Sequence, residues 1–176
     1  EYYGQFLINA LKAFDLKDLS LCGHSMGGLI ALDMVLNHKF AAKEVILVNS
    51  IYPTRVADAL LAKARAGNGD AANFIIKFGL YRRLLGMRNA FSEADDLVML
   101  DDLDACNSYE LDLNNLKNLE IPISIILGSK DRLVDSKAVE NFVDIVPSHT
   151  YTMDDVGHFS FFEDPVELSR IISEIV

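Results

Sequence analysis

The sequence predicts an α/β protein with a parallel sheet and helices on both faces of that sheet. Three short apolar runs have the length of buried strands and lie at residues 19–22, 45–48 and 123–127, and a weaker strand is expected at 149–153. Segments with apolar residues at helical spacing lie between most of these runs. Alternating strands and helices are typical of a parallel sheet that is covered by its crossover helices.

The first part of the chain is expected to form helix, strand, helix and strand in that order. Residues 2–14 have helical apolar spacing and lead through a polar turn into the first strand. A glycine-rich turn, "CGHSMGG", then leads into an apolar helix at 29–36. The run 45–48, within "KEVILVNS", is the next buried strand.

The alternation stops between the second and third strands. Residues 57–66 and 71–86 have helical patterns, and the acidic stretch that follows also has helical spacing. The regular order then returns with the strand 123–127, a helix at 137–146, the weaker strand 149–153 and a closing helix at 165–176. We therefore expect a core formed by residues 1–51 and 119–176, with a helical cap or lid at 52–118.

Composition excludes several classes of partner. The 176 residues are enough for one main core. A formal net charge of −10 repels nucleic acid and anionic membrane surfaces. The apolar runs are far shorter than the roughly 20 residues of a membrane-spanning helix. Cys22 and Cys106 do not have the spacing of a metal site or of a disulfide framework, so we expect no bound metal and two reduced thiols. We also expect no cofactor and a cytoplasmic location. The oligomeric state stays open.

The turn after the first strand contains a G-x-S-x-G motif, formed by Gly23, Ser25 and Gly27. Between a strand and a helix, this motif is typical of a nucleophile elbow, a tight and strained turn that exposes the serine hydroxyl. We expect the flanking glycines to be needed because a Cβ would clash there, and Gly28 to allow close helix packing. The backbone N–H of Met26 is then a candidate oxyanion donor at a helix N-terminus.

A serine nucleophile needs a base, and His158 is the best placed of the four histidines. It follows the last strand, so it should lie at the same carboxyl edge of the sheet as Ser25. The other three histidines are less suitable. His24 is held inside the elbow, and its side chain is expected to point away from the serine. His38 lies at a polar helix end, and His149 lies at the opposite end of the last strand.

The base in turn needs an acid to orient it, and Asp131 is the first candidate. It lies just past the third strand, in "ILGSKDRLV", on the edge that carries the serine. Asp135 is its main competitor, whereas Asp154 and Asp155 lie too close to the strand that leads to His158. The order serine, acid, histidine is the one expected for this type of elbow.

Through "GHSMGG", "ILGSKDRLV" and "VGHFSFFEDP" the chain resembles the α/β-hydrolase fold family, in particular its serine esterases and lipases. The resemblance covers nearly the whole chain and is weakest in the helical insertion, which it implies is a lid over the active site. It implies a Ser25–His158–Asp131 triad that cleaves small-molecule carboxylic esters through an acyl-enzyme. Acyl transfer, thioester, lactone and carbon–carbon bond cleavage stay open, because they share this triad.

The chain also departs from the family pattern. It begins at Glu1 without a methionine and within a helical pattern, so we expect a fragment that lacks the first strands, although a removed leader stays open. Nothing corresponds to the early loop that supplies a second oxyanion donor, and losing one donor typically costs about a hundred- to a thousandfold in rate. A truncated, non-catalytic domain that binds a partner is therefore the alternative from another class.

Overall fold

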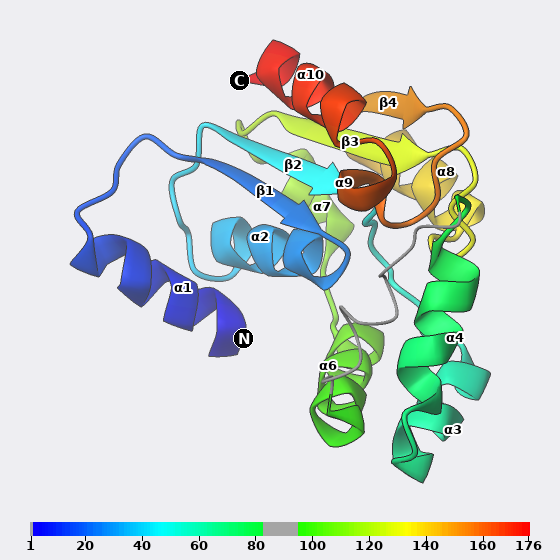
Figure 1. Ribbon diagram of the computed structural model, residues 1–176. Helices are drawn as coiled ribbons and strands as arrows, with labels where there is room; N and C mark the ends of the chain where they lie inside the picture. Colours follow the sequence, from blue (N-terminus) through cyan, green and yellow to red (C-terminus); the bar gives the residue numbers. More distant parts are fainter. Residues whose placement is uncertain (1, 83–94) are drawn as a thin grey trace.

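The computed structural model describes residues 2–82 and 95–176, and its centre is a parallel sheet (Figure 1). The order of the four strands follows the sequence: β1 (Ser20–His24), β2 (Glu44–Val48), β3 (Ile123–Gly128) and β4 (His149–Met153). Every neighbouring pair is parallel, so the carboxyl ends of all four strands meet at one edge. The predicted fold class is confirmed, and each predicted apolar run overlaps one strand.

Helices cover both faces of the sheet because successive strand residues point to opposite sides. In β2, Val45 and Leu47 belong to the apolar core on one face, whereas Ile46 and Val48 belong to the core on the other. The helices around the sheet are α1 (Tyr2–Ala13), α2 (Met26–Leu36), α8 (Ser136–Ile145) and α10 (Pro165–Ile175). Side chains of α2, α8 and the short helix α7 (Leu113–Lys117) complete the first core, and those of α10 complete the second.

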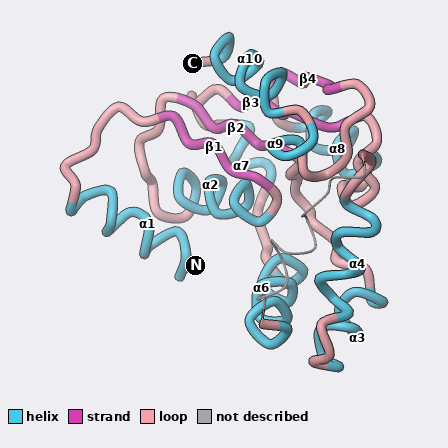
Figure 2. The backbone as a smooth tube through the Cα atoms, in the orientation of Figure 1, coloured by secondary structure: helices cyan, strands magenta, loops and turns pink. Residues whose placement is uncertain are grey.

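The segment between β2 and β3 is helical, as expected. It contains α3 (Asp58–Ala66), α4 (Asp70–Gly79), α6 (Asp96–Ser108) and α7 (Leu113–Lys117). The first three pack on one another around Leu60, Ala64 and Ala71, in a cluster separate from the cores beside the sheet. They lie below the sheet in the view of Figures 1 and 2, and the last turn of α4 reaches the loops after β3 and β4. Their role as a cap stays a prediction.

Two details differ from the sequence prediction. The helix expected at 71–86 ends at Gly79, where Leu80 turns to an extended conformation, and residues 83–86 lie outside the described part of the chain. The short helices α7 and α9 (Ser160–Glu163) were not predicted, because four or five residues are too few to show a helical period.

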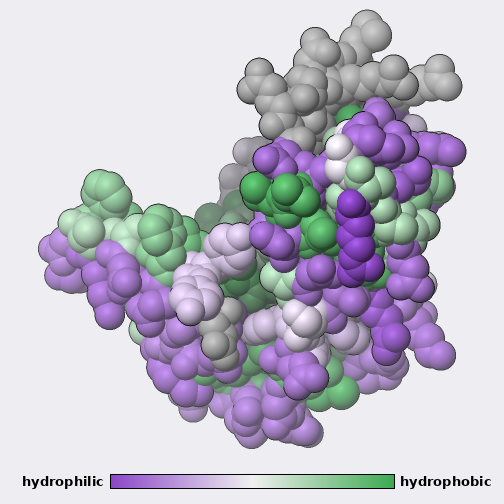
Figure 3. Space-filling model, turned by 90° about the horizontal axis from the view of Figure 1, so that it is seen from below, coloured by the Kyte–Doolittle hydropathy of each residue, from purple (hydrophilic) through white to green (hydrophobic). Residues whose placement is uncertain are grey.

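Apolar side chains gather on the surface over α1, at the left of Figure 3. Tyr2, Phe6 and Phe14 are the most exposed of them, and each keeps at least 70% of its surface accessible. Among the described helices, none is long and apolar enough to cross a bilayer.

Candidate active site

Ser25 lies in the turn between β1 and α2, at the carboxyl edge of the sheet. Its φ of 51° is in the left-handed region, which a residue with a Cβ adopts only where the surrounding structure holds it. Three hydrogen bonds hold it here: its N–H donates to Val48 O at 3.0 Å, and its carbonyl accepts from the Gly28 N–H at 3.0 Å and the Ser50 hydroxyl at 2.7 Å. The turn is thus the strained elbow that the motif predicts.

Two of the three elbow glycines are required by close contacts, and the third is not. A Cβ on Gly23 would lie 2.2 Å from the carbonyl oxygen of Gly27, and one on Gly28 would lie 2.3 Å from the Ser50 hydroxyl. A Cβ on Gly27 would meet no atom of the described residues within 4 Å, so the expected clash at that position is wrong. Gly27 already lies within α2, one residue past the start of the helix.

Met26 is the first residue of α2. The N–H groups of a first helical turn have no carbonyl partner within the helix, so the Met26 N–H is available to an acceptor beside Ser25. The partial positive charge of the helix N-terminus acts in the same direction and favours a negative oxygen at this place. The position of Met26 agrees with the predicted oxyanion donor, and that role stays a prediction.

Asp131 follows β3 and is buried, with 4% of its side chain accessible. Its Oδ1 accepts the backbone N–H groups of Leu133 and Val134 at 2.8 and 3.1 Å, and its Oδ2 lies 2.9 Å from Nδ1 of His158. Burial alone would raise the pKa of Asp131, but the hydrogen bond and charge of His158, the Leu133 N–H and Asn49 outweigh it and hold this pKa below its usual range. Asp131 is therefore a carboxylate that only accepts hydrogen bonds.

The rival acid has a structural role. The Asp135 side chain accepts from the N–H of Lys137 and caps the N-terminus of α8. The structure brings Asp131, and not Asp135, to the histidine.

His158 follows β4 in a loop and is 6% exposed. Because a carboxylate oxygen cannot donate, the proton of the imidazole must lie on Nδ1, which leaves the lone pair of the neutral ring on Nε2. The backbone of His158 is fixed at both ends: its N–H donates to Gly79 O at 2.6 Å, and its carbonyl accepts from Nε2 of His24 at 2.7 Å. Ring and backbone are thus both held in place.

His24 is a support for His158 rather than a second base. The centroids of their rings are 4.8 Å apart, and Nε2 of His24 must carry a proton because the carbonyl of His158 only accepts. Burial, followed by the charge of His158, lowers the pKa of His24 to about 4. His24 is therefore neutral at physiological pH. The two other histidines lie elsewhere: His38 pairs with Asp33, and His149 opens β4.

Ser25 and His158 open into one cavity of about 670 Å³. The elbow and the loop after β4 form one wall, and side chains of α3, α4 and α6 form another. Most of the lining from the helical segment and from the loop after β4 is apolar: Leu60, Phe74, Ile75, Phe78, Leu103, Phe159 and Phe161. The cavity therefore suits a ligand with a substantial apolar part.

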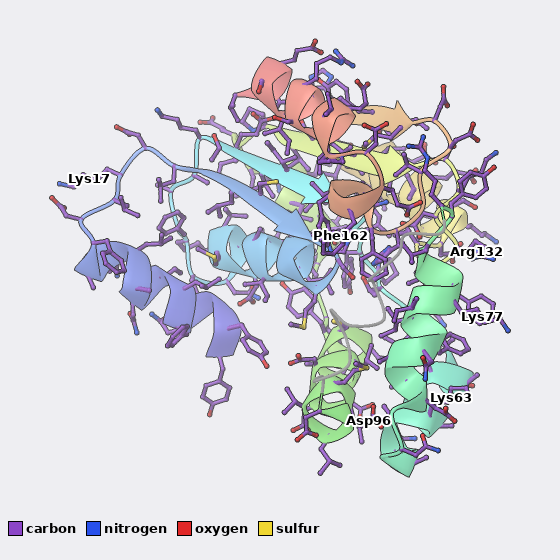
Figure 4. The ribbon with its side chains drawn as sticks, viewed as in Figure 1. Lys17, Lys63, Lys77, Asp96, Arg132 and Phe162 are labelled. Carbon is purple, nitrogen blue, oxygen red and sulfur yellow. The ribbon has the colours of Figure 1, made fainter. Side chains whose placement is uncertain are left out.

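The wall formed by α4 is tied to the loops that carry Asp131 and His158. Arg132 lies at the upper end of α4 in Figure 4, and its guanidinium donates to the carbonyls of Lys77, Phe78 and Leu80 at 2.7 to 3.2 Å. The carbonyl between them, of Gly79, accepts from the His158 N–H. The carbonyls at this helix end thus accept hydrogen bonds from Arg132, which follows the predicted acid, and from the backbone of His158, the predicted base.

Glu163, which follows the predicted base His158 by five residues, also connects α4 to this loop. The residue is 5% exposed, and its carboxylate accepts from the N–H groups of Tyr81, Arg82 and Gly157 at 2.8 to 3.1 Å. The sequence reasoning missed Arg132 and Glu163, since both act on residues far away in the chain.

No group of three or more metal-ligating side chains occurs in the described part of the chain, so these residues offer no metal site. The elements that the structure shows at the site are a serine on a strained elbow, a carboxylate–imidazole pair and an apolar cavity. Together with the parallel sheet, they define an α/β-hydrolase type of domain.

The sequence matches the model of the alpha/beta hydrolase family over residues 2–171, and the chain belongs to this family. No curated protein matches it significantly.

Solved structures of esterases resemble the chain in fold. An esterase from Exiguobacterium antarcticum has 17% identity and a TM-score of 0.86, with 98% of this chain and 71% of that chain covered. A thermophilic esterase has 20% identity and a TM-score of 0.84, with 98% and 72% covered. A 2-hydroxy-6-oxo-6-phenylhexa-2,4-dienoate hydrolase from Rhodococcus has 16% identity and a TM-score of 0.75, with 93% and 66% covered. The shared fold thus accommodates more than one reaction.

Proposed function

We propose that this chain is a serine hydrolase that cleaves carboxylic esters, with Ser25 as nucleophile, His158 as general base and Asp131 as the acid that orients it. The observation that carries the proposal is the buried contact of 2.9 Å between Asp131 Oδ2 and His158 Nδ1, beside a cavity that Ser25 also lines. This contact leaves Nε2 of His158 as the proton acceptor, as a serine nucleophile requires.

In the proposed reaction, the Ser25 hydroxyl attacks the carbonyl carbon of the ester while Nε2 of His158 takes its proton. The Met26 N–H donates to the oxygen that becomes negative in the tetrahedral intermediate. The imidazolium, stabilised by Asp131, then gives its proton to the leaving alcohol, and an acyl-Ser25 ester remains. A water molecule attacks this ester with the same base, which releases the acid and restores the hydroxyl.

The apolar lining supports esters with apolar acyl or alcohol parts as substrates. The helices of residues 52–118 would act as a cap that supplies one side of this cavity. The esterases among the similar structures support the same class of substrate, and the Rhodococcus hydrolase supports testing carbon–carbon bond cleavage as well.

The test combines covalent labelling with turnover. A fluorophosphonate probe should label the chain at Ser25, p-nitrophenyl esters should be hydrolysed, and the Ser25→Ala variant should do neither. A folded wild-type protein that takes no label and turns over no ester would contradict the proposal and favour a non-catalytic, partner-binding domain. Added acceptor alcohols, and thioester, lactone and diketone substrates, separate hydrolysis of esters from acyl transfer and from the related cleavages.

A further inference from the structure

A buried asparagine joins the two loops that carry the acid and the base. Asn49 follows β2, at the carboxyl edge of the sheet, and none of its surface is accessible. Its Nδ2 donates to Asp131 Oδ2 at 3.0 Å and to the carbonyl of Gly157 at 3.2 Å, and its Oδ1 accepts from the Ser160 hydroxyl at 2.6 Å. The amide thus contacts the acid and both sides of the base.

The orientation of this amide follows from its partners. A carbonyl and a carboxylate oxygen accept hydrogen bonds and do not donate them, so the NH₂ group must face Gly157 and Asp131. The hydroxyl of Ser160 is the one partner that can donate, and it faces Oδ1. Both N–H groups of the amide are used, and rotating it by half a turn would place its oxygen against two acceptors.

The backbone restricts the residue type further. Asn49 has a φ of 45°, in the region where asparagine, aspartate and glycine are the most favourable residues. Its N–H donates to Ile126 O at 2.8 Å, which fixes its backbone to β3 just before the acid loop. The side chain therefore starts from a fixed point between the two loops.

We propose that Asn49 is a positioning residue, whose amide holds Asp131 Oδ2 and the Gly157–Ser160 loop in the register that the Asp131–His158 contact needs. It touches no reacting atom. By donating to the oxygen that also receives His158 Nδ1, it directs the remaining lone pair of Oδ2 toward the imidazole and keeps the carboxylate ionised. This role rests on the proposed hydrolase function.

The matched variants are Asn49→Asp and Ser160→Ala. Aspartate keeps the size, the tolerance for a positive φ and the acceptor for Ser160, but it removes both donations and places a second carboxylate beside Asp131. We expect kcat for a p-nitrophenyl ester to fall about ten- to a hundredfold with little change in KM, the usual effect of one lost charge-assisted hydrogen bond. Ser160→Ala removes only the third bond, and it should lose stability but keep the wild-type pH profile.

The pH profile separates positioning from a general loss of stability. In Asn49→Asp, the added carboxylate either stabilises the protonated His158 or shares a proton with Asp131. With either effect, the enzyme becomes active only at a higher pH than the wild type. The acidic limb of kcat/KM should therefore move upward by about one pH unit. The neighbouring titratable groups, His24 and Glu163, are unchanged in this variant. If Asn49→Asp does not fold, Asn49→Gly, which also tolerates the backbone, should show the fall in kcat.

A measurement on the wild-type protein keeps this test independent of ester turnover. The side-chain amide resonances of Asn49 should shift in an NMR titration together with the ring of His158, because both share Asp131 Oδ2. The amide of Asn114, which donates to Asp112 at 3.0 Å, is the control and should not follow that ring. Wild-type kcat and pH profile in both Asn49 variants, or an Asn49 amide that ignores the titration, would overturn the role. Coupled resonances without any turnover would sustain it and reject the hydrolase function.

Discussion

Replacing Asp131 by asparagine should reverse the position of the proton on His158. The backbone N–H groups of Leu133 and Val134 both donate to Oδ1, whereas Asn49 alone donates to Oδ2, so we expect an amide at this place to direct its oxygen to the two backbone donors. Its NH₂ group then faces Nδ1 of His158, and this nitrogen becomes the acceptor. The proton moves to Nε2, which therefore cannot take the proton of the Ser25 hydroxyl.

The expected loss is large because the wrong tautomer dominates and the imidazolium loses its counter-charge. An aspartate-to-asparagine change at the acid of a comparable triad lowers kcat by about 10⁴-fold, which corresponds to roughly 5.5 kcal/mol of activation free energy. The same change at Asp135 is the matched control, because asparagine caps a helix about as well as aspartate does. Initial rates with a p-nitrophenyl ester and thermal unfolding of both variants provide the measurement.

Two results would refute this reasoning. If Asp131→Asn keeps more than about a tenth of the wild-type kcat, the tautomer of His158 does not depend on Asp131. If Asp135→Asn loses as much activity as Asp131→Asn while both stay folded, the acid has been assigned to the wrong residue. A lowered melting temperature alone would decide neither, since Asp131 also holds its own loop through two backbone bonds.

Three substitutions test the elbow, and a change of pH tests the acid. Ser25→Ala should abolish turnover and labelling with little change in the free energy of unfolding, and surviving activity would exclude the mechanism. Gly23→Ala should prevent normal folding, because its Cβ would lie 2.2 Å from the Gly27 carbonyl oxygen. Gly27→Ala should instead raise the free energy of unfolding by up to about 1 kcal/mol, because Gly27 lies within a helix and its Cβ would meet no atom of the described residues within 4 Å. Equal melting temperatures of these two variants would contradict the contacts. Because the folded-state pKa of Asp131 is lowered, its contribution to stability should be present above about pH 4 and be lost as the pH falls further; pH-dependent unfolding of wild type against Asp131→Asn measures this.

The sequence predicts the sheet and the elbow well because both depend on local patterns. The first three strands each contain a short apolar run, whereas β4 is mostly polar and was the weaker prediction. Ser25 is recognised by residues within two positions of it. The same motif does not tell which glycine faces a neighbour. Gly23 and Gly28 do, and Gly27 does not, because this depends on where the helix leaves the strand in three dimensions.

The helical segment is the least predictable part. The glycine at the end of α4, Gly79, lies inside the helix and is not the left-handed glycine that often follows a helix C-terminus. A Cβ on Gly79 would lie 2.6 Å from the ring of Phe159, a contact between residues far apart in the sequence. The partners of the last carbonyls of α4 could not have been inferred. Arg132 lies more than 50 residues from each of the three carbonyls it binds, and its own surroundings in the sequence resemble an ordinary charged turn.

The two oxygens of the Asp131 carboxylate differ in how far away in the sequence their partners lie. One oxygen is occupied by backbone groups two and three residues ahead, an arrangement typical of an aspartate at a turn, so position after a strand was enough to select it over Asp135. The other oxygen receives Asn49 and His158, which lie 82 and 27 residues away. Only the parallel sheet, which gathers the ends of β2, β3 and β4 at one edge, brings these groups together. The position of His158 after a strand was enough to predict it, because the chain has only four histidines to choose from. The same reasoning did not predict Asn49, because many side chains in the sequence could donate a hydrogen bond to a carboxylate.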